Sequence, residues 1–122
     1  MAGKIVASTI NDDTGVLATQ NGMTGIAKAW VNYNGSTQTI VGSYNISSVT
    51  YVSSAYYTLN FTTAMPNANY AVAGISGSTA GGSAKMLVPA GAQTTTTCPL
   101  TSYVFNASQT DSSYFAAAIF SS

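Results

Sequence analysis

The chain has 122 residues and a formal net charge of zero, with charged side chains at only 5% of positions, whereas soluble domains average about 25%. Nucleic-acid binding needs clustered cations that replace phosphate counterions, and the three lysines here lie far apart in a chain without arginine. No apolar run is long enough for a transmembrane helix and no polybasic segment favours a membrane surface, so we expect neither nucleic acid nor membrane insertion among the partners.

The first 24 residues differ in composition from the rest of the chain. Residues 1–10 predict one short strand, residues 11–15 a turn, and residues 15–24 mix small and polar side chains with a few apolar ones. These apolar side chains are too few to build a core of their own. We therefore expect residues 1–24 to form an extended arm that packs on the main body or on a neighbouring subunit and serves attachment or oligomerisation.

Residues 25–35, with the sequence GIAKAWVNYNG, predict the strand that opens the main domain. Alternation along an extended backbone places Lys28 beside Trp30 on one face and Tyr33 on the other. The dipeptide Asn34-Gly35 indicates a tight hairpin, because a primed two-residue turn needs positive φ at both positions. We expect Trp30 and Tyr33 in the core or at an interface, with ligand stacking as the alternative for Trp30, and the stem of Lys28 can lie over the indole ring.

The next part of the chain contains one unusually regular strand pattern. Residues 55–63 alternate so that Tyr57, Leu59 and Phe61 share one face, which is typical of a half-buried antiparallel strand. We assign these three side chains to the core or an interface. Further strands are predicted at residues 36–42, 43–52, 70–75, 85–88, 93–98, 100–107 and 114–120.

This spacing of strands sets the expected fold class. Eight or nine short strands with turn signals between them and no convincing helix predict an all-β protein. We expect an antiparallel β-sandwich, jelly-roll-like and of about eight short strands, over residues 25–122, behind the arm of residues 1–24. The lone Cys98 forms no intrachain disulfide, and beside Pro99 it is expected to be a small buried side chain at a strand-to-loop junction.

The inventory of reactive side chains argues against catalysis. Without histidine, glutamate or arginine, and with a single cysteine, the chain has no catalytic triad and no zinc-ligand cluster. Asp12 and Asp13 with Asn11 are better read as a solvated turn than as a cation site, and Asp111 has an equally plain role in a turn. We expect no enzymatic activity, no cofactor and no metal, with an enzyme as a distant third reading.

Surface binding is the remaining class of function. Tyrosines flanked by Asn, Ser and Gly form an adaptable polar surface of the kind found in antibody loops. We expect any recognition surface in the loops after Ile75, with the candidate residues Ser78, Thr79, Tyr103 and Tyr114. A sheet with so few charges aggregates if its edges are exposed, so we expect a homo-oligomer, with a trimer favoured over a dimer.

Three segments carry a resemblance to a known family: residues 24–35 (TGIAKAWVNYNG), 42–50 (GSYNISSVT) and 57–70 (YTLNFTTAMPNANY). They resemble small proteins and fibre-end domains of tailed bacteriophages that are labelled tail-fibre or virion structural proteins. The resemblance covers roughly residues 1–75 and implies a virion component, made in the cytoplasm of the host bacterium and assembled as a trimer. It supplies no receptor-binding residues.

Two hypotheses follow from the resemblance. The first is a small tail-fibre or appendage protein that attaches to the host surface, with other phage virion proteins and a host surface glycan or protein as partners. The second is a capsid decoration protein, of the cement or head-fibre kind, that stabilises the phage head and needs no ligand. Copy number separates the two, since decoration proteins are present in hundreds of copies and fibres in few.

Overall fold

The computed structural model describes residues 3, 6, 9–12, 15–18, 25–78, 85–104 and 110–121. All elements in these ranges that extend over several residues are β-strands, as expected from the density of β-branched and aromatic side chains. The strands are β1 (Thr9–Asp12), β2 (Gly15–Ala18), β3 (Ala29–Asn34), β4 (Thr39–Tyr44), β5 (Ile46–Ser53), β6 (Tyr56–Phe61), β7 (Ala71–Gly77), β8 (Lys85–Pro89), β9 (Thr97–Val104) and β10 (Tyr114–Phe120).

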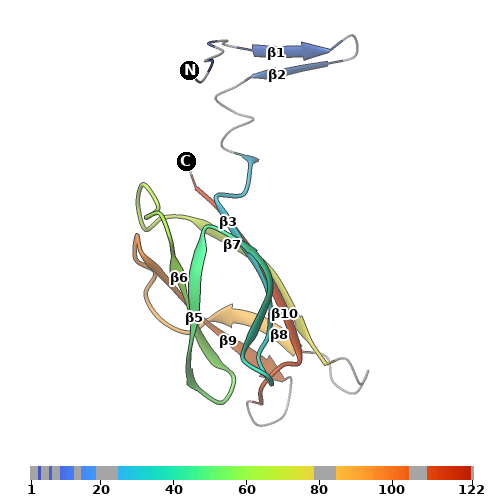
Figure 1. The fold of residues 1–122 in the computed structure, drawn as a ribbon, viewed down its shortest axis with the longest axis vertical. Coiled ribbons are helices and arrows are strands. Elements are labelled where there is room, and N and C mark those ends of the chain that lie inside the picture. The colour runs from blue at the N-terminus through green and yellow to red at the C-terminus, as the bar shows by residue number, and fades with distance from the viewer. Residues whose placement is uncertain are drawn as a thin grey trace.

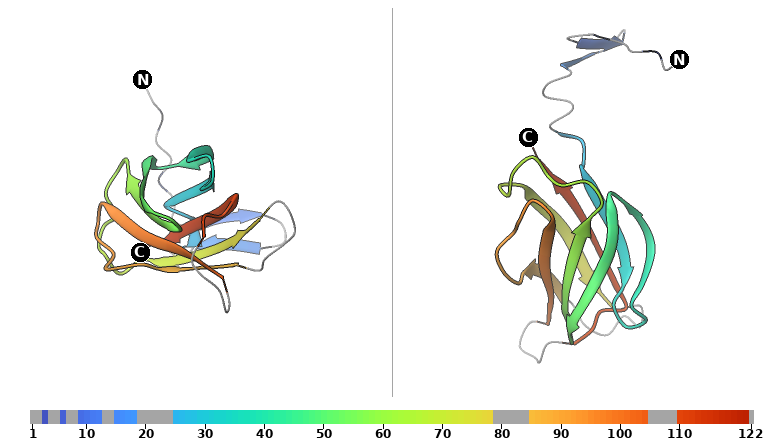
Figure 2. Two further views of the ribbon diagram at one scale, coloured as in Figure 1. Left: turned by 90° about the horizontal axis from the view of Figure 1, so that it is seen from below. Right: turned by 60° about the vertical axis from the view of Figure 1, so that its left-hand side comes forward.

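Eight of the strands form one antiparallel sheet in the order β4-β3-β10-β7-β8-β9-β6-β5. The sheet curls on itself, so that the two edge strands β4 and β5 approach each other at Asn45, which connects them (Figures 1 and 2). Strands β7 to β10 form a Greek key, because β10 returns to lie beside β7. The all-β antiparallel prediction is confirmed. The strands form one continuous, nearly closed, barrel-like sheet in place of the expected two-layered sandwich.

The core lies inside the curled sheet and follows the period of two. In β6 and β10 every second residue is buried, as alternation across a strand requires. Tyr33, Tyr57, Leu59 and Phe61 are all buried, which confirms their assignment to the core. The rings of Tyr33 and Tyr57 lie 5.6 Å apart edge to face, and each lies 5.1 Å from the ring of Phe115, a geometry that stabilises aromatic pairs.

Trp30 lies on the outer face of the sheet and not in the core, so only the interface half of its prediction stays open. Its side chain is 43% exposed. Alternation along β3 buries Val31 and Tyr33 and therefore turns Trp30 outward. The indole ring leans across the neighbouring strand over Gly42, where an added Cβ would lie 3.5 Å from the ring.

The β3–β4 hairpin is not closed by the predicted primed turn at Asn34-Gly35. Asn34 pairs with Thr39, so the connection has four residues, and Gln38 has the positive φ of 56°. The Asn34 side chain organises this turn, because its Oδ1 accepts hydrogen bonds from the backbone N–H groups of Ser36 and Thr37, each at 3.0 Å. The strand that follows begins later than predicted and continues through Gly42 to Tyr44.

Gly35 is required by packing rather than by its φ angle. A Cβ at this position would lie 2.2 Å from the Tyr57 hydroxyl and 2.8 Å from the carbonyl oxygen of Ser112. The backbone N–H of Gly35 donates to that same carbonyl at 2.8 Å. The turn therefore presses directly onto the segment that leads into β10.

Pro99 lies inside β9, so the predicted break between the strands at 93–98 and 100–107 is wrong: the strand is continuous from Thr97 to Val104, and residues 105–107 lie outside the described residues. Pro99 pairs with Thr58 in β6, and its carbonyl oxygen accepts a hydrogen bond of 3.1 Å from the N–H of Ala90, just after β8 ends. The N and C=O of one residue in an antiparallel strand point to the same neighbour. The missing N–H of Pro99 therefore faces the end of β8, where the ladder stops. Cys98 is buried in this strand, as predicted.

The arm contains a small hairpin of its own. Strands β1 and β2 pair with each other and form a separate two-stranded sheet among the described residues. The strand runs to Asp12, so the turn predicted from residue 11 begins too early, and Asp13 lies outside the described residues. Attachment or oligomerisation by residues 1–24 stays a prediction. Within the described part of the chain, no helix has the length and apolar character that crossing a bilayer requires.

Candidate functional site

The barrel has two ends of different construction. At the arm end the chain enters β3 and leaves β10, and the Lys28 N–H donates to the carbonyl of Ile119 at 2.7 Å (Figure 1). The opposite end, here called the loop end, contains the β3–β4 and β5–β6 turns, the ends of β7 and β9 and the starts of β8 and β10 (Figures 1 and 2). Polar side chains gather at both ends. At each end, one polar side chain forms hydrogen bonds with several segments of the chain.

Asp111 is the central polar residue of the loop end. Its Oδ1 accepts hydrogen bonds from the Tyr57 hydroxyl at 2.8 Å and from the backbone N–H of Ala55 at 2.7 Å. Its Oδ2 accepts one from the Tyr51 hydroxyl at 3.1 Å. All three donors belong to the β5–β6 hairpin, so one carboxylate fastens this hairpin to the segment that precedes β10.

The ionisation of this cluster is shifted by its surroundings. Burial alone would raise the pKa of Asp111, but the Ala55 N–H, the Tyr57 and Tyr51 hydroxyls and the charge of Lys85 outweigh it, so this pKa lies below its usual range. Burial, together with the hydrogen bond to Asp111, raises the pKa of the Tyr57 phenol. Burial lowers the pKa of Lys85, and the charge of Asp111 opposes that change. The Lys85 ammonium donates to the backbone carbonyl oxygens of Asp111 at 2.6 Å and Thr110 at 3.2 Å.

Hydroxyl groups continue the cluster into the barrel. The Oγ atoms of Ser76 and Ser102 lie 2.7 Å apart, as do those of Ser76 and Ser112, and Ser102 also contacts Ser112. The Tyr33 hydroxyl is buried without a hydrogen-bond partner among the described groups, and burial followed by the charge of Asp111 raises its pKa.

This arrangement favours a structural role for the Asp111 cluster. A carboxylate with a lowered pKa and both oxygens accepting hydrogen bonds is a weak base near neutral pH. No group of three or more His, Cys, Asp or Glu residues that could hold a metal lies in the part of the chain that the structure describes. The sequence predicted an ordinary turn residue at Asp111. The available signal was its isolation as the single carboxylate after residue 13 in a chain with few charges.

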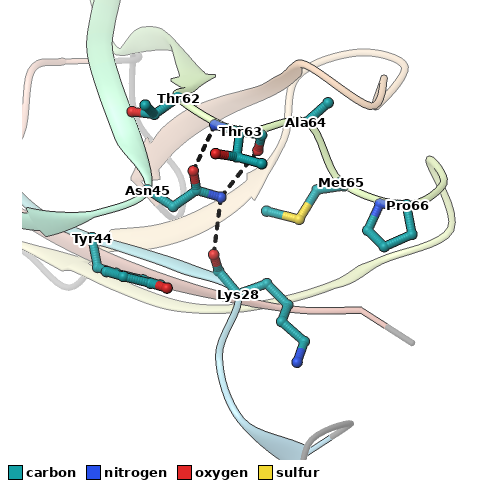
Figure 3. A pocket seen from close by; sticks show the side chains of 8 residues that line it. All are labelled: Lys28, Tyr44, Asn45, Thr62, Thr63, Ala64, Met65 and Pro66. Atoms are coloured by element: carbon teal, nitrogen blue, oxygen red, sulfur yellow. Dashed lines mark hydrogen bonds between the residues drawn. The ribbon is translucent and has the colours of Figure 1, made fainter. Parts of the chain in front are cut away.

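The arm end contains a pocket of about 450 Å³ (Figure 3). Asn45 forms one wall and holds its neighbours together, because its Nδ2 donates to the carbonyl oxygens of Lys28 at 3.0 Å and Thr63 at 3.1 Å while its Oδ1 accepts from the Thr63 N–H at 2.7 Å. Asn45 has a φ of 56°, a conformation that asparagine tolerates better than most residues. The side chains of Tyr44 and Met65 line the same pocket.

A third feature is an apolar area on the outer face of the sheet, here called the outer patch. Trp30, Ile75, Met86 and Tyr103 are 43%, 62%, 53% and 41% exposed, respectively. Ala118 pairs with Trp30, Ala116 with Ile75, and Met86 with Tyr103, so these residues follow one another across β3, β10, β7, β8 and β9. A groove of about 480 Å³ runs over the two alanines between Trp30 and Ile75. We define the outer patch by the residues Trp30, Ile75, Met86, Tyr103, Ala116 and Ala118.

The predicted recognition residues that the structure describes lie toward one end of the barrel, and their role in recognition stays a prediction. Ser78, Tyr103 and Tyr114 lie toward the loop end, from the registers of β7, β9 and β10. Tyr103 is separated from Tyr114 by β7 and β8, about 14 Å at the usual strand spacing. Thr79 lies outside the described residues. Tyr103 instead belongs with the outer patch, which sequence reasoning missed because its members come from five strands.

The chain matches no protein-family model, no curated protein and no solved structure.

Proposed function

We propose that this chain is a virion structural protein of a tailed bacteriophage, a small tail-fibre or appendage protein that takes part in attachment to the host surface. The observation that carries this proposal is the difference between the two ends of the barrel. The chain enters and leaves at the arm end, and the loop end is directed away from it (Figure 1). A short appendage needs this arrangement, because one end is held by the particle and the other meets the host.

The three segments that resemble phage proteins support the proposal by their positions. Residues 25–35 form β3 and its turn, residues 42–50 form the corner at Asn45, and residues 57–70 form β6 and its exit. These segments are scaffold. Loop-end candidates such as Ser78 and Tyr114 come from the other half of the chain, where a receptor-specific surface can vary without disturbing the scaffold.

The proposal includes partners and a location. The protein is made in the cytoplasm of the host bacterium and is assembled into the virion, with other virion proteins and further copies of itself as partners. Edge strands β4 and β5 and a barrel wall built largely from uncharged side chains favour association in an assembly. A host surface glycan or protein is the proposed contact of the loop end.

One observation favours the second hypothesis, a capsid decoration protein that stabilises the phage head. The outer patch is broad and apolar, and such a face suits a protein that lies against a capsid surface. A decoration protein of this kind would act through the patch and would need no ligand at the loop end.

Quantitative mass spectrometry of purified particles, combined with labelling of this protein for electron microscopy, tests the proposal. The expected result is a few copies per particle at the tail or at a vertex. Hundreds of copies spread over the head would establish the decoration role instead, and absence from particles would overturn both. Binding of the purified protein to whole host cells is the companion measurement, with no binding at high micromolar concentration counting against host attachment.

A further inference from the structure

The outer patch is exposed in the isolated chain and has the composition of a protein interface. Tryptophan, tyrosine and methionine are enriched at the centres of such interfaces, where charged side chains are depleted. The outer patch contains Trp30, Tyr103 and Met86 and no charged residue. The charged side chains that the structure places in the barrel belong to Lys28 at the arm end and to Lys85 and Asp111 at the loop end.

We infer that the outer patch is the surface through which copies of this chain contact one another. This inference deepens the proposed function, on which it rests for its biological setting, by assigning one face of the barrel to a second copy. Two observations select a second copy over a different protein, namely the absence of charge and the shape of the surface.

The absence of charge makes the outer patch compatible with itself. Recognition between different proteins is commonly guided by opposite charges on the two surfaces. A surface without charge offers no such guide, but it can meet an identical surface without like-charge repulsion. In a contact between identical surfaces, each copy contributes the same apolar side chains, so the buried apolar area is twice that of one patch.

The outer patch combines a groove with exposed side chains beside it, so an identical surface can in turn fill its groove. Ala116 and Ala118 form a low floor on β10, and Trp30 and Ile75 rise on either side of it. In a two-fold contact, which gives a dimer rather than the trimer favoured from the sequence, each copy can place its exposed side chains over the alanines of the other, since residue i meets residue j and j meets i. Interdigitation of this kind fills a groove that water otherwise occupies.

The four large side chains supply a substantial part of the area that a specific contact needs. Four large side chains, each exposing about half of a 150 to 250 Å² surface, amount to roughly 400 Å² of apolar area. That value lies within the range of about 300 to 600 Å² for the largest patch on a typical monomer. A standard interface takes about 800 Å² from each partner, so these four side chains supply about half of that area.

The test compares matched substitutions by sedimentation velocity and by light scattering coupled to size exclusion. The intact chain should show a mass above its monomer value of 12.4 kDa at micromolar concentration. Ile75→Lys should weaken association about 100-fold or more, because an unpaired charge in an apolar interface is costly. Val52→Lys is the control, since Val52 in β5 is 62% exposed, the same fraction as Ile75, but lies outside the outer patch.

Each outcome decides the inference. A monomeric intact chain at about 100 µM, an Ile75→Lys variant that associates as the intact chain does, or a Val52→Lys variant that dissociates equally would overturn it. Circular dichroism establishes that each variant is folded, and Met86→Lys on the neighbouring strand replaces Ile75→Lys if the latter does not fold. Loss of capsid binding by Ile75→Lys without a change in self-association would assign the outer patch to another protein and overturn the inference.

Failure of the inference and failure of the proposed function give different results. A protein that associates through the outer patch but is absent from virions leaves this inference standing and removes the function. A protein that is monomeric in solution but present in virions overturns this inference and leaves the proposed function standing.

Discussion

The two ends of the barrel are each held by one polar side chain, but the two side chains differ in chemistry. Asn45 at the arm end joins the segment before β3 to the segment after β6 through an amide that both donates and accepts. Asp111 at the loop end joins the β5–β6 hairpin to the approach to β10 through a carboxylate that only accepts. The arm end therefore depends on backbone conformation and the loop end on ionisation, and each dependence can be tested separately.

The largest expected effect follows from Asp111→Ala. We expect the free energy of unfolding to fall by about 2 to 4 kcal/mol, because the Tyr57 hydroxyl and the Ala55 N–H lose their acceptor and each loss costs about 1 to 3 kcal/mol. Chemical denaturation at neutral pH measures the change. Asp111→Asn is the matched control, which keeps an acceptor oxygen and should lose less. A loss below about 1 kcal/mol for Asp111→Ala would show that the carboxylate does not hold the hairpin.

A smaller effect is expected at the arm end. Asn45→Ala should lower the free energy of unfolding by about 2 to 3 kcal/mol. It removes side-chain hydrogen bonds, and it places alanine, which tolerates a φ of 56° less well than asparagine, at this position. Asn45→Gly should cost about 1 kcal/mol less, since glycine adopts this conformation freely. If both variants lose the same free energy of unfolding, the backbone conformation at Asn45 does not contribute to the effect.

Gly35→Ala tests the contact between the β3–β4 turn and the loop-end cluster. We expect a loss of about 1 to 3 kcal/mol, the usual cost of overpacking, because the new Cβ meets the Tyr57 hydroxyl and the Ser112 carbonyl. Gly77→Ala provides the control, since no atom lies within 4 Å of a Cβ there. The two variants should differ clearly in denaturation midpoint, and identical midpoints would contradict the close approach.

The smallest effect is expected from pH. The pKa of Asp111 is lower in the folded state than its ordinary value of 3.8, so the stabilisation by its carboxylate is fully present above 3.8 and is lost as the pH falls through the folded-state pKa. Denaturation series from pH 7 to pH 2 should show this decline in the intact chain. The same series for Asp111→Asn should show a shallower decline, whereas parallel curves would assign the acid sensitivity to other groups.

Part of this structure could be predicted from the sequence because strand alternation is a local property. The period of two in residues 55–63 identified Tyr57, Leu59 and Phe61 as one face, and that face is buried. The closing strand was predicted at residues 114–120, where β10 lies. Both predictions need only the geometry of an extended backbone and the tendency of apolar side chains to leave water.

The rest depended on which strands become neighbours. Alternation shows that Trp30 and Tyr33 point to opposite faces but not which face is inside, and the pairing of β3 with β10, far along the chain, decided it. Pro99 fits within β9 only because β8 ends beside it. Asp111 acquires its role from donors more than fifty residues away. Local alternation therefore predicts most of the strands and which side chains share a face, whereas the inner face, the polar clusters at both ends and the outer patch arise from contacts between distant segments.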